Sequence, residues 1–177
     1  MLWISDEWKD YQVLDTSGGE RLERWGKFIL VRPDPQVIWN SPRENRLWAQ
    51  PGARYVRSRT GGGKWQTFKR IPAVWQVRYK DLTFNIKTMG FKHTGLFPEQ
   101  AVNWDLVRGM IERAERPVKV LNLFAYTGGA TVACLKSGGQ RRTRPPPAWQ
   151  TALCAGLWTI VSSLCSEKFA GATGTTL

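Results

Sequence analysis

The sequence has no apolar run long enough to cross a membrane and no sign of a secretion signal. No window of about 18 residues is both apolar and free of charge. The first eleven residues are acidic and aromatic, whereas a signal peptide begins with a basic region followed by an apolar core. We therefore expect no membrane span, no signal peptide and a cytoplasmic location.

Cysteine and histidine are scarce, with three and one in 177 residues. Cys134, Cys154 and Cys165 are an odd number and form no Cys-x-x-Cys pair, and His93 is the single imidazole available to a metal. Structural zinc needs four such ligands, and a disulfide framework needs paired cysteines. We predict reduced thiols and no metal site.

Acidic residues are also few, 14 against 26 lysines and arginines, which gives a net charge of +12. Residues 1–139 still carry +9 when the last 38 residues are set aside. Basic side chains gain free energy by displacing counterions from phosphates, so this balance favours an anionic partner such as nucleic acid, although charge alone does not name that partner. Eight of the ten tryptophans precede residue 105; such rings either stack on bases or pack a small β core, and for any single ring we favour the core.

Short runs typical of strands alternate with turn-forming residues between residues 11 and 87. The predicted strands cover residues 11–14, 28–31, 36–39, 54–57, 74–79 and 82–87. The last two form a hairpin across Lys80-Asp81, with Trp75, Val77 and Tyr79 on one face. The pattern predicts a small antiparallel barrel or sandwich.

Residues 61–64, Gly-Gly-Gly-Lys, invite comparison with a phosphate-binding loop. No serine or threonine follows Lys64, and no helical pattern follows the loop, so a nucleoside triphosphate site is rejected. A basic hairpin tip that touches RNA and a plain solvated turn both stay open, and the turn is favoured.

Beyond residue 91 the pattern becomes helical. A polar loop over 91–97 leads into Pro98-Glu99, a favourable helix start. Val102, Leu106 and Met110 then recur at helical spacing in a segment that continues through residue 115 and ends before a proline at 117.

A strand, a glycine turn and a second helix follow. Residues 118–126 are almost continuously apolar, as expected of a strand buried on both faces. Thr127-Gly128-Gly129 interrupts this run, and residues 130–137 form a helical pattern closed by two glycines. This order begins a doubly wound α/β domain.

The glycine turn suits an anionic or zwitterionic ligand. Without a Cβ the backbone allows close approach, and the free N–H groups of a helix start point at the ligand. The spacing does not match Gly-x-Gly-x-x-Gly, so a nicotinamide- or flavin-dependent oxidoreductase is disfavoured.

Two segments of the sequence carry a family resemblance. Residues 120–129, Val-Leu-Asn-Leu-Phe-Ala-Tyr-Thr-Gly-Gly, resemble the first motif of S-adenosylmethionine-dependent methyltransferases related to the bacterial large-subunit ribosomal RNA methyltransferases. Residues 92–100, Lys-His-Thr-Gly-Leu-Phe-Pro-Glu-Gln, resemble the Lys-Thr-Gly-Phe-Phe-x-x-Gln segment that those enzymes carry upstream. Both occur in the family's order.

The resemblance implies S-adenosyl-L-methionine as cofactor and ribosomal RNA as substrate. It places the glycine turn under the methionine part of the cofactor and the upstream segment over the pocket. The cofactor-binding positions carried over are Gln100, Asn122, Phe124, Tyr126, Thr127, Gly128 and Gly129. Lys92, His93 and Thr94 are candidates for contact with the pocket or RNA, although a loop-ordering role suits Lys92 and Thr94 equally well.

The strand departs from the family pattern at one position. Asn122 stands where many methyltransferases have an aspartate, so the strand lacks that carboxylate. Cys134 falls within the second helix, facing the sheet by its spacing, and we predict a core residue and not a catalytic nucleophile. Catalytic residues remain unknown, because the family places them on later strands.

The predicted fold class is α+β, with a β-rich N-terminal domain over 1–90 and the start of a Rossmann-like methyltransferase domain over 91–139. Residues 140–177 are an atypical tail, frameshifted or disordered, with Glu167 as their single acid and three prolines where the next strand belongs. We expect a truncated product of uncertain activity and, from an unpaired apolar edge, poor solubility. A non-enzymatic basic RNA-binding β-module is the alternative; the target base, the methylated atom and the oligomeric state stay open.

Overall fold

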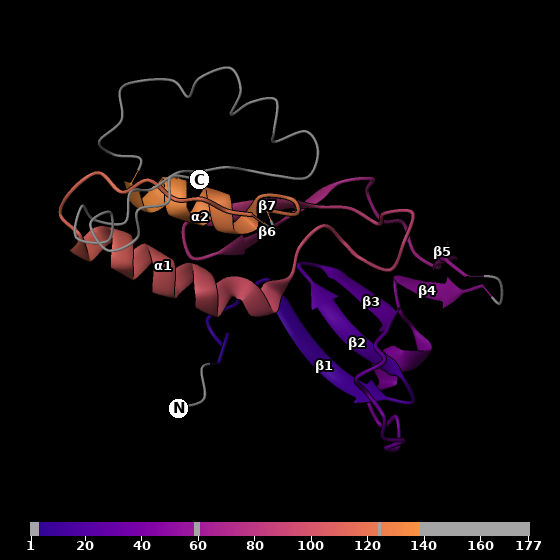
Figure 1. Ribbon diagram of the computed structural model, residues 1–177. Coiled ribbons are helices and arrows are strands. Elements are labelled where there is room, and N and C mark those ends of the chain that lie inside the picture. Colours follow the sequence, from indigo (N-terminus) through magenta and orange to yellow (C-terminus); the bar gives the residue numbers. More distant parts are fainter. Residues whose placement is uncertain (1–3, 59–60, 124, 139–177) are drawn as a thin grey trace. The chain divides into compact units, whose positions relative to one another are not determined.

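The computed structural model describes residues 4–58, 61–123 and 125–138 (Figure 1). These fall into two compact units: the β unit, Ser5–Pro98, and the helical unit, which holds residue 4 and residues 99–138. No helix in the described ranges has the length and apolar character needed to cross a membrane.

The β unit contains a five-stranded sheet and a separate two-stranded sheet. The five strands are β1 (Tyr11–Ser17), β2 (Glu20–Trp25), β3 (Phe28–Pro33), β4 (Ala53–Arg57) and β5 (Gly63–Thr67), hydrogen-bonded in that order. A 3-10 turn, η1 (Arg46–Ala49), lies between β3 and β4, and the second sheet is the hairpin β6 (Trp75–Tyr79) and β7 (Leu82–Ile86).

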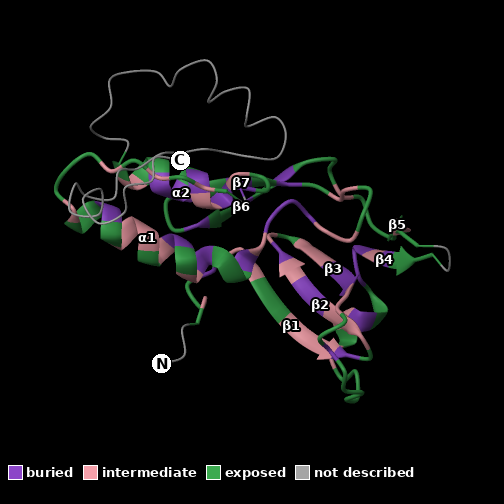
Figure 2. Cartoon of the chain, viewed as in Figure 1, coloured by how far each residue is buried: buried purple, intermediate pink, exposed green. Residues whose placement is uncertain are grey.

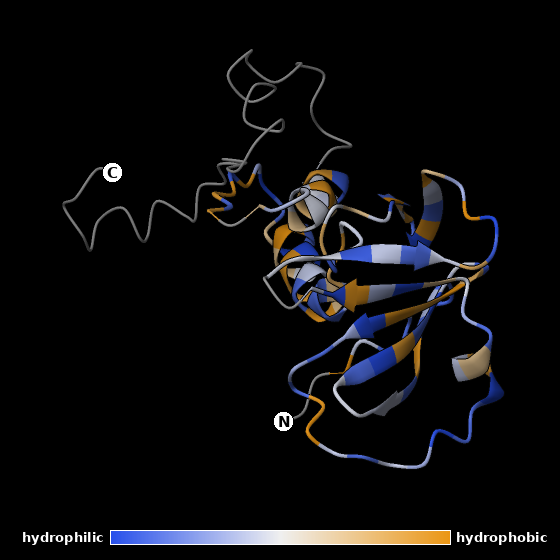
Figure 3. Cartoon of the chain, turned by 90° about the vertical axis from the view of Figure 1, so that its right-hand side faces the viewer, coloured by the Kyte–Doolittle hydropathy of each residue, from blue (hydrophilic) through white to orange (hydrophobic). Residues whose placement is uncertain are grey.

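The predicted hairpin forms as expected from its sequence pattern. Tyr79 pairs with Leu82 across the two-residue turn, in which Lys80 adopts a left-handed φ of 52°. The predicted face of Trp75, Val77 and Tyr79 is buried. Figure 3 shows the same banding of hydrophilic and hydrophobic residues along other strands of the β unit.

Several strand predictions need correction. Strands β2 and β5 were not predicted, and the predicted strand 36–39 is not one. The reason lies in the β1–β2 turn, where Gly18 and Gly19 adopt left-handed φ values and donate their N–H groups to the carbonyls of Trp39 and Val37. Residues 36–39 therefore lie against this turn, with Val37 buried, and do not join the ladder.

One pairing in the larger sheet also differs from the expected antiparallel pattern. Strands β3 and β4 are parallel, with Leu30 opposite Ala53. A parallel pair needs a long connection, and residues 34–52, which include η1, provide it. The sheet is therefore mixed, with three antiparallel pairings and one parallel pairing.

Aromatic and aliphatic side chains form the core of the β unit. Leu22 and Val31 pack with Trp48, and Trp25 is fully buried. Complete burial of a side chain such as Leu22 contributes about 1.5–3 kcal/mol. Trp8 and Trp75 are buried as well, so in these four cases the preference for core packing over base stacking is confirmed.

The helical unit contains the two predicted helices, α1 (Ala101–Arg113) and α2 (Gly129–Gly138). The Nε atom of Arg108 donates a 2.9 Å hydrogen bond to Ser137 Oγ, which joins the two helices. The buried residues of α1 are Ala101, Trp104 and Ile111.

Two of the apolar residues that recur at helical spacing in α1 do not lie on its buried face. Leu106 is 41% exposed and Met110 is 57% exposed, and in Figure 2 both helices show exposed stretches beside buried ones. On α2, Val132 and Leu135 are similarly exposed. Both helices thus present apolar side chains that the described residues do not cover.

The predicted strand over residues 118–126 is also wrong within the described residues. Asn122 makes a single β bridge, and the residues around it form no ladder. Leu121 and Leu123 are about half exposed, where burial on both faces was expected. A parallel strand is held by neighbours on each side and by helices on both faces, and the described residues supply too few of them. The whole is of mixed α+β class, as predicted.

Candidate functional site

The chain between Ala125 and Gly129 makes a tight turn at the start of α2. Gly128 N donates to Ala125 O at 2.8 Å, and Val132 N donates to Gly128 O at 2.8 Å, so the helix follows the turn at once. Both Tyr126 and Gly128 have positive φ values, 51° and 92°. A left-handed backbone conformation costs a non-glycine residue such as Tyr126 about 1–3 kcal/mol, and such strain is often found at functional sites.

The backbone at this turn faces open space. A Cβ built on Gly128 would meet no atom of residues 4–58, 61–123 and 125–138 within 4 Å, and Tyr126 and Thr127 are exposed. The first N–H groups of a helix have no partner inside it, and the helix dipole places partial positive charge at the same end. The turn therefore offers backbone donors and positive potential to a carboxylate or a zwitterion.

Residues on either side of the turn in the sequence hold it in place. The side-chain amide of Asn122 donates to Thr131 Oγ1 at 3.1 Å, joining the preceding segment to the first turn of α2. Thr131 is buried, and so is Cys134, whose thiol pKa is raised by burial. Cys134 is thus a core residue, as predicted, while Phe124 lies outside the described residues.

Gln100 lies at the start of the other helix. It immediately precedes α1, and its Oε1 accepts a 2.9 Å hydrogen bond from Asn103 Nδ2. Arg108 contacts Ser137, and a Cβ built on Gly138 would lie 3.8 Å from the Ile111 side chain, so both helices end close together and run in the same general direction (Figure 1). The starts of α1 and α2 therefore share one end of the helical unit.

The upstream segment that contains Lys92, His93 and Thr94 belongs to the β unit. Arg32 Nη1 donates to the Lys92 carbonyl at 3.3 Å, and Lys87 N donates to the Thr94 carbonyl at 3.3 Å. Thr94 is fully buried, and its hydroxyl has no hydrogen-bond partner in the described part of the chain. Burial favours the loop-ordering role for Thr94 over direct contact with RNA.

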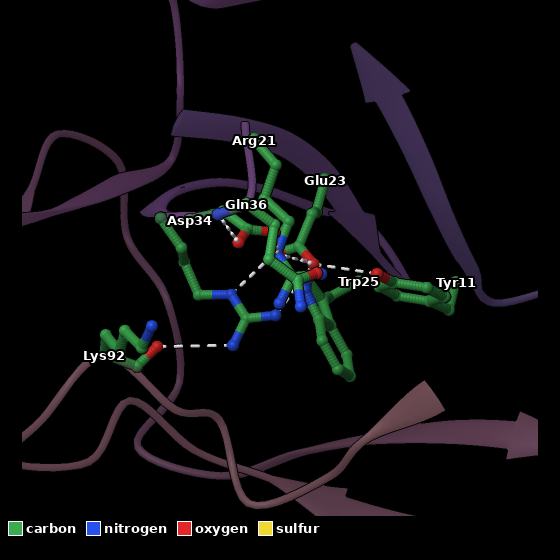
Figure 4. A network of polar contacts seen from close by, with 8 residues as sticks. Tyr11, Arg21, Glu23, Trp25, Asp34, Gln36 and Lys92 are labelled. Carbon is green, nitrogen blue, oxygen red and sulfur yellow. Dashed lines mark hydrogen bonds and ion pairs between the residues drawn. The ribbon is translucent and has the colours of Figure 1, made fainter. Parts of the chain in front are cut away.

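A buried ion pair anchors this segment to the sheet (Figure 4). Arg32 forms two hydrogen bonds with the Glu23 carboxylate, at 2.5 and 2.7 Å, and Glu23 is fully buried. Tyr11 Oη and Trp25 Nε1 also donate to this carboxylate, at 2.8 and 3.3 Å. Glu23 is therefore satisfied on both oxygens.

The protonation of this pair follows from its surroundings. Burial alone would raise the pKa of Glu23, but the guanidinium of Arg32 and the hydrogen bonds hold it below its ordinary value. Burial and the Glu23 carboxylate raise the pKa of Tyr11, so the phenol stays protonated and continues to donate.

Positive charge is concentrated around the Lys92-His93 loop. Burial, followed by the charge of Arg57, lowers the pKa of Lys92, although Asp34 opposes the shift. Burial, followed by the charges of Arg32 and Lys92, lowers the pKa of His93. Positive charges held close together destabilise the protonated form of each basic group.

Sequence reasoning did not single out the residues of this region beyond Lys92 and His93. It missed the Glu23–Arg32 pair and the nearby Arg21 and Arg57. A signal existed in Ser17-Gly18-Gly19, which is a hairpin turn and predicts a strand immediately after it. That strand would have placed Arg21 and Glu23 in a ladder, but not their long-range partners.

Comparison with known proteins finds similarity among solved structures. No family model matches the chain, and no curated protein matches it. The crystal structure of a SAM-dependent methyltransferase from Agrobacterium tumefaciens matches with a TM-score of 0.69 and 32% identity, over 75% of this chain and 42% of that one. A putative SAM-dependent methyltransferase from Streptococcus mutans matches with a TM-score of 0.51 and 19% identity, over 75% of this chain and 37% of that one.

A third solved structure, a putative methyltransferase complexed with SAH, gives the same values as the Streptococcus protein. The chain thus spans less than half the length of the proteins that it resembles. At 19% identity the last two matches establish the fold alone. The structural neighbours are methyltransferases, and the few helices described here fit an incomplete Rossmann-like domain.

Proposed function

We propose that the chain carries the first cofactor-binding turn of a cytoplasmic S-adenosylmethionine-dependent methyltransferase that acts on ribosomal RNA. The observation that carries this proposal is the open backbone at Gly128, at the start of α2. Support comes from the 32% identity to an Agrobacterium methyltransferase and from the neighbour complexed with SAH, the demethylated form of the cofactor.

The residues of the turn suit the cofactor's amino-acid end. Its carboxylate matches the N–H groups of Gly129 and the residues that follow, and the absence of a side chain at Gly128 leaves room for close approach. In this proposal Gln100, which precedes α1 at the same end of the helical unit, contributes its side-chain amide. Bound there, S-adenosylmethionine supplies an activated methyl group, and the protein's part is orientation and electrostatics.

Calorimetric titration of the 177-residue chain with S-adenosylmethionine tests the proposal. We expect measurable binding by the unaltered chain. Gly128→Ala should weaken it at least about tenfold, because a Cβ occupies the open space and the φ of 92° resists a side chain. Gly62→Ala is the matched control, since Gly62 also has a positive φ and an open surrounding but lies in the β unit.

A second candidate function rests on the cations around Lys92. A basic β unit that binds RNA without catalysis would show RNA binding and no heat with S-adenosylmethionine. That pair of results would replace the enzymatic proposal. Equal weakening by Gly62→Ala and Gly128→Ala would also count against it, since only general destabilisation acts in both variants.

A further inference from the structure

The register of the larger sheet brings arginines from three strands to one end. Arg21 on β2 pairs with Arg32 on β3, and Val31 on β3 pairs with Arg54 on β4. Because β3 and β4 are parallel, continuing this register places Arg57 just beyond the last residue of β3. Arg21, Arg32 and Arg57 thus lie at the same end of neighbouring strands.

The loop at residues 91–93 covers this end. Arg32 Nη1 donates to the Lys92 carbonyl, and Trp65 Nε1, from β5, donates to the Phe91 carbonyl at 3.2 Å. These two bonds attach the loop to two strands of the sheet. They bring Lys92 and His93 to the arginines.

The carboxylates at this end do not balance its cations. The Glu23 carboxylate forms an ion pair with Arg32. Arg21 Nε lies 3.4 Å from the Glu23 carboxylate and 3.5 Å from that of Asp34. Within residues 4–58, 61–123 and 125–138, Arg57 and Lys92 make no ion pair. Four basic side chains therefore face two carboxylates. Burial and then the charge of Arg57 lower the pKa of Lys92, and Asp34 opposes this shift.

An exposed aromatic ring lies beside the uncompensated charge. Phe91 is 43% exposed, and its ring meets His93 edge to face at 5.5 Å. The His93 ring also meets the ring of Phe97 edge to face, at 5.2 Å. An exposed ring next to cations is the composition of surfaces that bind single-stranded nucleic acid, where bases stack and phosphates pair. A free phosphate or an acidic peptide would make no comparable use of the ring.

We propose that Arg21, Arg57, Lys92 and His93 form a phosphate-binding surface for single-stranded RNA, with Phe91 as the stacking platform. We call these five residues the cationic surface. The inference rests on the proposed function for its choice of RNA, but it requires nothing of the cofactor turn.

Fluorescence anisotropy with a labelled single-stranded RNA of about 12 nucleotides tests the cationic surface. Arg57→Gln with Lys92→Gln should weaken binding by the full chain at least about tenfold and lower the slope of log K against log salt by about 1–1.5. The control is Lys27→Gln with Arg70→Gln, which removes equal charge from exposed residues. They adjoin the start of β3 and the end of β5, at the other end of the sheet. We expect this control to bind nearly as the unaltered chain does.

His93 provides an independent readout because it is the single histidine of the chain. Its ring is surrounded by Lys92 from its own loop, Arg21 from β2 and Arg32 from β3, and burial and these charges lower its pKa. A bound phosphate stabilises the imidazolium, so an NMR titration should show the His93 pKa rising when RNA is added. RNA binding without that rise, or equal loss in both double variants, would overturn the inference.

Two competitors separate the possible sources of negative charge. Displacement of the RNA by inorganic phosphate or by poly-glutamate, at the same concentration of negative charge, would also overturn the inference. Such a result would show that the Phe91 ring contributes nothing to binding. Calorimetry with S-adenosylmethionine on the Arg57→Gln, Lys92→Gln variant keeps the two proposals apart. The two proposals together predict that this variant still binds the cofactor and has weakened RNA binding. In the unaltered chain, cofactor binding without RNA binding would refute only the cationic surface, and RNA binding without cofactor binding would refute only the cofactor turn.

Discussion

At the scale of single residues, the Glu23–Arg32 pair shows why part of the site is hidden from sequence reasoning. A buried charge is favourable only where its partners are close, and those partners come from β1, β2 and β3. No local pattern identifies a glutamate as fully buried. The glycine turn is different, because Tyr126–Gly129 carries its geometry in neighbouring residues, and its placement at a helix start was predictable.

Replacement of Glu23 by glutamine should be strongly destabilising. An amide cannot neutralise the buried guanidinium of Arg32, so we expect the free energy of unfolding to fall by about 3–5 kcal/mol. Glu20→Gln is the control, since Glu20 pairs with Arg43 nearer the surface, and its loss should cost about 1 kcal/mol or less. Urea unfolding of both variants measures the difference; similar values would contradict the structural role given to Glu23.

The same carboxylate predicts a stability loss in acid. The folded-state pKa of Glu23 lies below its unfolded value of about 4.3, so its stabilisation is complete above that pH and is lost as pH falls through the folded pKa. Thermal melts between about pH 5 and pH 2 should show a steeper decline for the unaltered chain than for Glu23→Gln. Parallel curves would show that other carboxylates govern acid unfolding.

At the scale of elements, local signals predicted both helices and the β6–β7 hairpin. They failed where pairing is decided by distant residues. Residues 118–126 have the composition of a buried parallel strand, yet Asn122 makes one bridge and the neighbouring leucines are half exposed. Residues 36–39 have strand composition, but their carbonyls accept hydrogen bonds from the β1–β2 turn, so they do not join a strand ladder. The composition of a segment shows that it could form a strand, but whether it does so depends on pairing partners that are distant in the sequence.

Amide hydrogen exchange should separate these elements. We expect the N–H groups of residues 118–121 to exchange rapidly, because no ladder protects them, while those of Leu22 and Val31 exchange slowly in the centre of the sheet. Mass spectrometry of short peptic fragments resolves the two regions. Protection over 118–121 equal to that of β2 and β3 would show that the strand forms in solution.

At the scale of the whole molecule, high positive charge accompanies exposed apolar side chains in the helical unit. The charge of +12 keeps molecules apart, whereas Leu106, Met110, Leu121 and Leu123 offer surface for self-association. Salt screens the repulsion and leaves the apolar contact intact.

We therefore predict that light scattering by the full chain rises with salt and with protein concentration. Leu121→Gln with Leu123→Gln should reduce that rise, and it should change the free energy of unfolding by only about 1 kcal/mol or less, because both side chains are already half exposed. Leu22→Ala, in the buried core, should cost about 2–5 kcal/mol in the same unfolding assay. Scattering that falls with added salt would indicate that charge contacts, and not apolar ones, drive association.

The most direct test of the cofactor turn is a backbone NMR titration of the ¹⁵N-labelled chain with S-adenosylhomocysteine. We predict that the amide resonances of Gly128, Gly129 and Ala130 shift together and saturate, while those of Gly18 and Gly19 in the β unit stay in place. If S-adenosylhomocysteine leaves the amides of residues 128–130 unmoved, or moves only resonances of the β unit, the turn at Gly128 does not hold the methyl donor.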